Sequence, residues 1–153
     1  MKFDLQGKRI WVAGHRGLVG SALVKKMGNL DIDLVTANRN EVDLRDQRAT
    51  NEFLSDNKIN AAIIAAGIVG GIKANAEQPA RFLFDNLAMA TNIIHGAHVA
   101  GLEKLLFLGS SCMYPRLASQ PVNEESLLTG ALETTNEWYA IAKIAGLKLC
   151  QAY

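Results

Sequence analysis

The 153-residue sequence has little of what marks several protein classes. It has only two cysteines, Cys112 and Cys150, which favours a reducing cytoplasm over a disulfide framework. The two also lack the spacing of a metal site, so no bound metal is predicted. No apolar run approaches the roughly 20 residues of a membrane span, and residues 1–6 lack the apolar core of a signal peptide. A net charge of +1 predicts neither a nucleic-acid partner nor a membrane partner.

What the sequence does contain is typical of one α/β domain. Hydrophobic residues make up 49% of it, and glycines outnumber prolines 13 to 3. Short apolar runs alternate with segments of helical periodicity, which predicts a parallel sheet with helices on both faces. The expected strands span 9–13, 32–36, 61–66 and 104–108. The expected helices span 18–28, a segment capped by Asp46, about 79–100, and a segment from about 137, with a loop over 112–136.

A glycine motif, Gly14-His-Arg-Gly17-Leu-Val-Gly20, lies between the first expected strand and helix. In this context it indicates a dinucleotide-binding turn. Gly14 permits the tight turn, Gly17 lets backbone approach the pyrophosphate, and Gly20 lets helix and strand pack closely. Leu18 and Val19 complete the helix N-terminus, whose free N–H groups face phosphates. The alternative is a plain strand–helix turn.

The end of the second expected strand indicates which cofactor is bound. An NAD site usually has an acidic residue there, whereas the stretch 36–40 has none before Glu41. Arg39 and, in the glycine loop, Arg16 are expected to pair with a 2′-phosphate, which predicts NADP(H). Arg39 as a solvated loop residue is the alternative. Asp43 is expected either to reach the adenine edge or to be a turn residue.

Tyr139 and Lys143 are candidates for proton transfer. Their spacing of four places them on one helix face, and a neighbouring ammonium is expected to lower the tyrosine pKa. Ser110 or Ser111, after the fourth expected strand, is expected to hydrogen-bond the same substrate oxygen. An amphipathic helix surface remains the alternative for the pair.

Cys112 is a further candidate. A thiol two residues after Ser110 is expected beside the reacting carbon, where it would exchange protons with carbon. The alternative is a small buried hydrophobe. Structural roles are expected for Cys150, His15, His95 and His98.

These motifs together resemble the extended short-chain dehydrogenase/reductase family, and within it the subgroup that epimerises and reduces GDP-4-keto-6-deoxy-mannose. The matching stretches are 13–20, Ala65-Ala66-Gly-Ile-Val-Gly-Gly71, 107–115 and 136–146. The Val-Gly-Gly and Ser-Ser-Cys-x-Tyr-Pro elements separate this subgroup from general sugar epimerases. The resemblance extends over essentially the whole chain.

The resemblance implies roles for individual residues. Ser110, Tyr139 and Lys143 match the family's catalytic triad, and Cys112 matches its epimerisation acid/base. The cofactor contacts it implies are Gly14, Arg16, Gly17, Leu18, Val19, Gly20, Arg39, Asp43, Ala65, Ala66, Tyr139 and Lys143.

The resemblance also implies a larger parent protein. Residues 1–153 would form an incomplete NADP-binding Rossmann domain, a doubly wound parallel sheet truncated before its last strands and the C-terminal substrate lobe. The partner acid/base would be a histidine beyond residue 153. A GDP-sugar substrate and a homodimer are expected for the complete enzyme. Two other functions remain open: another NAD(P)-dependent sugar-nucleotide epimerase or dehydratase, and a non-catalytic nucleotide-binding module.

Overall fold

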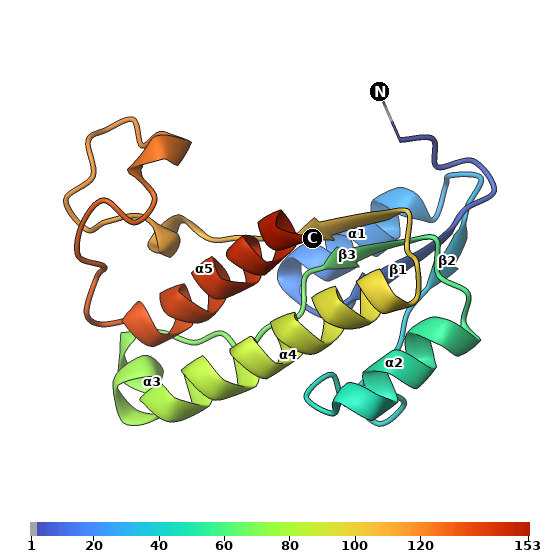
Figure 1. Cartoon of the computed structure of the whole chain (residues 1–153), viewed down its shortest axis with the longest axis horizontal. Helices are drawn as coiled ribbons and strands as arrows, with labels where there is room; N and C mark the ends of the chain where they lie inside the picture. Colours follow the sequence, from blue (N-terminus) through green and yellow to red (C-terminus); the bar gives the residue numbers. More distant parts are fainter. Residues whose placement is uncertain (1–2) are drawn as a thin grey trace.

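The computed structural model describes residues 3–153 as a parallel four-stranded sheet with helices on both faces (Figure 1). The strand order is β2-β1-β3-β4. The strands are β1 (Arg9–Ala13), β2 (Asp33–Val35), β3 (Ala61–Ile64) and β4 (Lys104–Phe107). The helices are α1 (Leu18–Met27), α2 (Gln47–Asp56), α3 (Ile72–Glu77), α4 (Pro79–Val99) and α5 (Glu137–Ala152). Two short 3-10 turns lie at Ser111–Met113 and Glu124–Ser126.

Strand β1 is central, and its side chains alternate between two cores. Ile10 and Val12 face the core that α1 covers, together with Met27. Trp11 and Ala13 face the larger core, which α2, α4 and α5 cover. Because a buried parallel strand is apolar on both faces, this arrangement explains the unbroken apolar run of β1. The predicted α/β fold is confirmed.

Most of the elements expected from the sequence form, with slightly different ends. Asp46 caps α2 by accepting a hydrogen bond from the Ala49 N–H at 3.0 Å. Pro79 begins α4, a position that needs no N–H donor. The third strand ends at Ile64, two residues earlier than predicted, and the short helix α3 was not predicted. Its six residues are too few to show a helical period.

Leu18 and Val19 are apolar and recur at helical spacing with Leu23 and Met27, but their side chains do not join the core. Leu18 is 92% exposed and Val19 51% exposed. They occupy the first turn of α1, beyond the edge of the sheet, so the inward face begins at Gly20 and continues through Leu23 and Met27.

The carboxyl ends of all four strands lie at one edge of the sheet, because the strands are parallel. The segments that follow them, at 14–17, 36–45, 65–71 and 108–113, therefore gather there. This is the edge where open α/β sheets bind ligands. Within residues 3–153, no helix has the length and apolar character needed to cross a bilayer.

Candidate functional site

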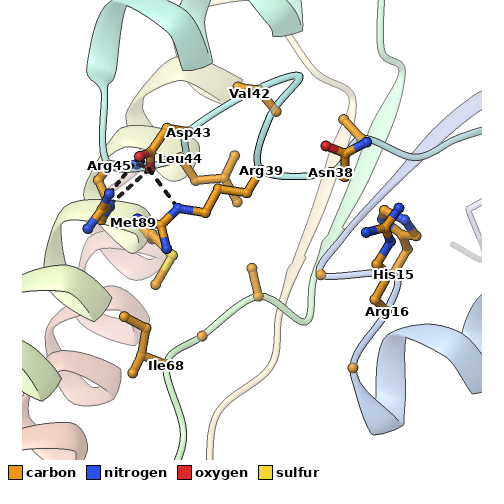
Figure 2. Close-up of a pocket in the computed structure, with 15 residues that line it drawn as sticks. His15, Arg16, Asn38, Arg39, Val42, Asp43, Leu44, Arg45, Ile68 and Met89 are labelled. Carbon is orange, nitrogen blue, oxygen red and sulfur yellow. Dashed lines mark hydrogen bonds and ion pairs between the residues drawn. The ribbon is translucent and has the colours of Figure 1, made fainter.

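A cavity of about 320 Å³ opens at this edge, between the glycine turn and the loop after β2 (Figure 2). The segment after β3 forms its floor. Six of the twelve predicted cofactor residues line it, whereas Leu18, Val19, Gly20, Ala65, Tyr139 and Lys143 do not. The full lining is Gly14, His15, Arg16, Gly17, Ala37, Asn38, Arg39, Val42, Asp43, Leu44, Arg45, Ala66, Gly67, Ile68 and Met89.

Two positions in the glycine turn require glycine. Gly14 has φ +85°, and a Cβ there would lie 2.6 Å from the backbone nitrogen of Ala66. A Cβ on Gly20 would lie 2.1 Å from the carbonyl oxygen of Gly14. The turn therefore presses against both α1 and the end of β3, where Ala65 donates its N–H to Ala13 at 2.9 Å. The tight turn and the close helix–strand packing predicted from the motif are both present.

Gly17 is the N-cap of α1, and no side chain caps this helix. The N–H groups of Leu18, Val19 and Gly20 lie in the first turn, so they have no carbonyl partner within the helix. They provide a positively polarised helix end beside the cavity. A cofactor contact by Leu18 or Val19 is therefore a backbone contact, since neither side chain lines the cavity.

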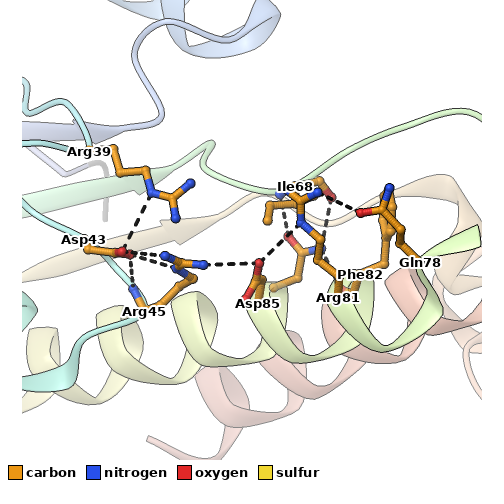
Figure 3. Close-up of polar contacts among 9 residues, drawn as sticks. Arg39, Asp43, Arg45, Ile68, Gln78, Arg81, Phe82 and Asp85 are labelled. Carbon is orange, nitrogen blue, oxygen red and sulfur yellow. Dashed lines mark hydrogen bonds and ion pairs between the residues drawn. The ribbon is translucent and has the colours of Figure 1, made fainter. Parts of the chain in front are cut away.

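Asp43 is engaged by Arg45 (Figure 3). Its carboxylate accepts hydrogen bonds from Arg45 Nε at 3.0 Å and Nη2 at 2.7 Å. These bonds, more than any other influence, lower the pKa of Asp43 to about 2. Arg45 Nη1 also lies 3.5 Å from Oδ2 of Asp85, which ties the loop after β2 to α4. Asp43 is therefore a charged loop residue, and its bonds to Arg45 hold the loop after β2 in place at this wall of the cavity.

The two arginines expected at a 2′-phosphate line the same cavity on opposite sides. Arg39 Nε lies 3.7 Å from Oδ2 of Asp43, whereas Arg16 lies across the cavity beside His15 (Figure 2). Their approach to a single phosphate is therefore not seen in this arrangement. Glu41 folds back so that its carboxylate accepts the Asn38 N–H at 2.7 Å.

The segment after β3 connects this cavity to a second one. Asn86 of α4 is buried and fastens the segment by accepting the Ile68 N–H at 2.7 Å and donating to the Ile68 carbonyl at 3.0 Å. Residues 66–68 line the first cavity, and Val69 and Gly70 line the second. Continuous backbone thus joins the two.

The second cavity, also of about 320 Å³, brings together three of the four predicted catalytic residues. Ser110, Cys112 and Tyr139 line it, and Cys112 Sγ donates a hydrogen bond to Ser110 Oγ at 3.1 Å. Loop 108–113 supplies Ser110 and Cys112, and α5 supplies Tyr139. They meet because α5 packs on the 3-10 turn Ser111–Met113. The other lining residues are Val69, Gly70, Asn75, Ser111 and Asn136.

Lys143, the fourth predicted catalytic residue, lies behind this cavity and does not line it. It is 6% exposed, donates from Nζ to the Leu108 carbonyl at 2.9 Å, and lies 4.7 Å from the centroid of the Phe107 ring. Its Nζ is 5.8 Å from the centroid of the Tyr139 ring, so the two do share one helix face. Burial lowers the pKa of Lys143.

The expected lowering of the Tyr139 pKa is wrong for this arrangement. Burial raises the pKa of the Tyr139 phenol, and the electrostatic influence of the nearby Cys112 adds to the increase. The ammonium of Lys143 is directed to Leu108 and does not compensate. Tyr139 therefore holds its proton at neutral pH, as a proton donor must.

The residues expected to be structural lie mainly outside the cavities. Cys150 packs against the larger core, and burial raises the pKa of its thiol. On α4, His95 Nδ1 lies 2.6 Å from the Tyr153 hydroxyl, and His98 stacks on the Tyr153 ring. His15 lines the first cavity instead of only packing in its loop.

Comparisons with known proteins match almost the whole chain. A sequence model described as the NAD dependent epimerase/dehydratase family matches residues 10–153. The chain is 57% identical over 149 residues to a GDP-L-fucose synthase of Sinorhizobium fredii, covering 97% of this chain and 48% of that protein. It is 51% identical over 147 residues to the GDP-L-fucose synthase of Escherichia coli, covering 95% of this chain and 46% of that protein.

A solved structure is similar as well. It is a GDP-D-glycero-L-gluco-heptose synthase from Campylobacter jejuni, determined in the presence of NADPH. Its TM-score is 0.93 at 36% identity, covering 99% of this chain and 44% of that one. This chain thus spans about half the length of the relatives that it matches.

Proposed function

Because this chain belongs to the NAD dependent epimerase/dehydratase family, we propose that its full-length gene product converts GDP-4-keto-6-deoxy-D-mannose to GDP-L-fucose with NADPH. One observation carries the proposal: Cys112, Ser110 and Tyr139 share a cavity that adjoins the dinucleotide-type cavity along residues 66–70. A proton-exchanging thiol and a phenol at one site suit a reaction with both an epimerisation and a reduction. The names of the two relatives above support the choice of sugar.

In the epimerisation, the substrate ketone acidifies the C–H bonds on the two carbons that flank it. Cys112, as its thiolate, takes a proton from such a carbon, so that the electron pair of the broken C–H bond enters an enolate. The partner acid/base that the family resemblance implies, a histidine beyond residue 153, then gives a proton to the opposite face and inverts the carbon. Ser110 holds the Cys112 thiol at 3.1 Å and thereby orients it toward the cavity.

In the reduction, Tyr139 donates its phenolic proton to the ketone oxygen as an alcohol forms. Burial keeps this proton in place at neutral pH, and Ser110 offers a second hydrogen bond to the same oxygen. Lys143, anchored on Leu108, places a positive charge behind the tyrosine ring.

The first cavity fits the dinucleotide. The glycine turn leaves no room for a Cβ at Gly14 or Gly20, and the N–H groups of the α1 N-terminus are free for phosphates. Arg16 and Arg39 supply positive charge on the two sides. When bound, NADPH supplies the hydride for the ketone carbon.

Product analysis tests the proposal. We expect the full-length gene product, incubated with GDP-4-keto-6-deoxy-mannose and NADPH, to yield GDP-L-fucose. A reduced but unepimerised sugar, or turnover only with a GDP-heptose, would instead indicate another sugar-nucleotide enzyme of the family. Dinucleotide binding without turnover of either sugar would indicate a binding module.

We also predict a preference for NADPH that depends on Arg39. The Arg39→Asp variant should bind NADPH more weakly by tenfold or more, since a charged hydrogen bond is worth roughly 1.5–3 kcal/mol, and should bind NADH almost unchanged. Titration of cofactor fluorescence measures both affinities. Arg48→Asp on α2 is a matched control, because Arg48 is exposed and outside the cavity. Equal losses for both cofactors would remove Arg39 from phosphate recognition.

We further propose that the full-length gene product forms a homodimer through α4 and α5. The two helices pack against each other, and each leaves large apolar side chains exposed. Those side chains are Phe84 and Val99 of α4 and Trp138 and Ile141 of α5.

A further inference from the structure

Asn75 has an unusual environment for a residue outside the predicted machinery. It lies in α3 and is 4% exposed. Its Nδ2 donates to the carbonyl oxygens of Gly70 at 3.0 Å and of Gly71 at 3.1 Å. These bonds fix the orientation of the amide, because the flipped amide would set an oxygen against two carbonyl oxygens. Both N–H groups of the side chain are thereby used.

The other end of the same amide has no partner. Asn75 Oδ1 is buried, and no described residue donates a hydrogen bond to it. A buried acceptor left in this state costs roughly 1–3 kcal/mol. Asn75 lines the cavity of Ser110, Cys112 and Tyr139. Asn136, at the start of α5, lines it too and also has a buried Oδ1 without a partner.

The chemistry of Oδ1 restricts what it binds. As a neutral acceptor, it needs an O–H or N–H donor, so a ketone or phosphate oxygen does not fit. Sugar hydroxyl groups are such donors. Of the two carbons that flank the ketone in the proposed substrate, only C3 bears a hydroxyl. Cys112, which exchanges protons with carbon, lines the same cavity.

We infer that Asn75 Oδ1 accepts a hydrogen bond from the C3 hydroxyl of the sugar, which makes Asn75 a substrate-binding residue that selects sugars hydroxylated at C3. This inference rests on the proposed function. The Nδ2 bonds fasten the Gly70–Gly71 turn, and this anchoring presents Oδ1 in a fixed position.

The test uses Asn75→Ser in the full-length gene product. A serine in a helix hydrogen-bonds the carbonyl four residues earlier, here that of Gly71, so it replaces one anchoring bond while it removes Oδ1. Asn51→Ser is the matched control, because Asn51 Oδ1 is also buried without a partner but lies outside this cavity. Calorimetry with GDP-mannose and its 3-deoxy analogue measures binding to each protein, and NADPH is titrated in parallel.

We expect the wild type and Asn51→Ser to prefer the hydroxylated sugar by about tenfold, the value of one hydrogen bond. In Asn75→Ser this preference should disappear, with NADPH affinity unchanged. A retained preference, or a loss of NADPH binding instead, would overturn the role of Asn75. Wild-type protein that prefers C3-hydroxylated sugar but forms no GDP-L-fucose would overturn the proposed reaction and leave Asn75 as a hydroxyl-binding residue. If the wild type binds neither sugar, the inference about Asn75 fails, and product analysis alone decides the proposed reaction.

Discussion

Replacing Tyr139 by phenylalanine in the full-length gene product should slow ketone reduction by roughly 10²–10⁴-fold, the usual worth of a positioned proton donor. The affinity for NADPH should stay nearly the same, because the ring keeps its packing and only the hydroxyl is lost. The rate of NADPH oxidation with GDP-4-keto-6-deoxy-mannose measures the first quantity, and cofactor titration measures the second.

Tyr153→Phe is the matched control. It removes a hydroxyl that contacts His95 at 2.6 Å, outside the cavity of Tyr139, so turnover should not change. The direction of the pH dependence follows from burial, which raises the pKa of Tyr139. The proton-donating form is present below this pKa, so reduction by the wild type should fall only as the pH rises above the ordinary range of a phenol. Normal turnover by Tyr139→Phe would remove Tyr139 from the mechanism.

Replacing Cys112 by serine should separate the two chemical stages. Serine keeps the size and the hydrogen bond to Ser110, which the thiol makes at 3.1 Å. An alcohol is a far weaker acid than a thiol, so proton exchange with carbon should slow by roughly 10²–10⁴-fold. Tyr139 still donates its proton to the ketone oxygen in this variant. The product should therefore shift toward the directly reduced, unepimerised 6-deoxy sugar.

Two measurements check this shift: the ratio of the two sugars among the products, and the incorporation of solvent deuterium beside the ketone. Cys150→Ser is the matched control, because Cys150 packs against the larger core and lines neither cavity of the site. It should leave the product ratio unchanged. If Cys112→Ser forms GDP-L-fucose at the normal rate, Cys112 is a packing residue.

Features that depend on neighbours in the sequence could be predicted from it. The cap at Asp46, the start of α4 at Pro79 and the glycine turn at Gly14 follow from local backbone requirements. The alternation of strands and helices, which sets the fold class, is likewise read from local periodicity. The place of Ser110 and Cys112 after the fourth strand follows from the same pattern, whereas Tyr139 joins them because α5 packs on the 3-10 turn Ser111–Met113.

Features that depend on contacts across the sheet could not be predicted. Leu18 is apolar like Leu23 and Met27 of the same helix, and only the position of α1 against β1 shows that it is exposed. Lys143 was expected to act on Tyr139, but its Nζ binds Leu108, 35 residues earlier in the chain. A spacing of four puts two residues on one helix face; it does not say which carbonyl lies within reach.

The sequence by itself thus determined the fold class, the family resemblance and the chemical groups available to the site, because each depends on residue type and short spacing. The tertiary structure decided how those groups are used. It set the strand order β2-β1-β3-β4, committed Asp43 to Arg45, and left Asn75 Oδ1 unpaired in the second cavity. The physical reason is that a hydrogen bond or a buried acceptor is defined by distances between segments far apart in the chain, which packing alone fixes.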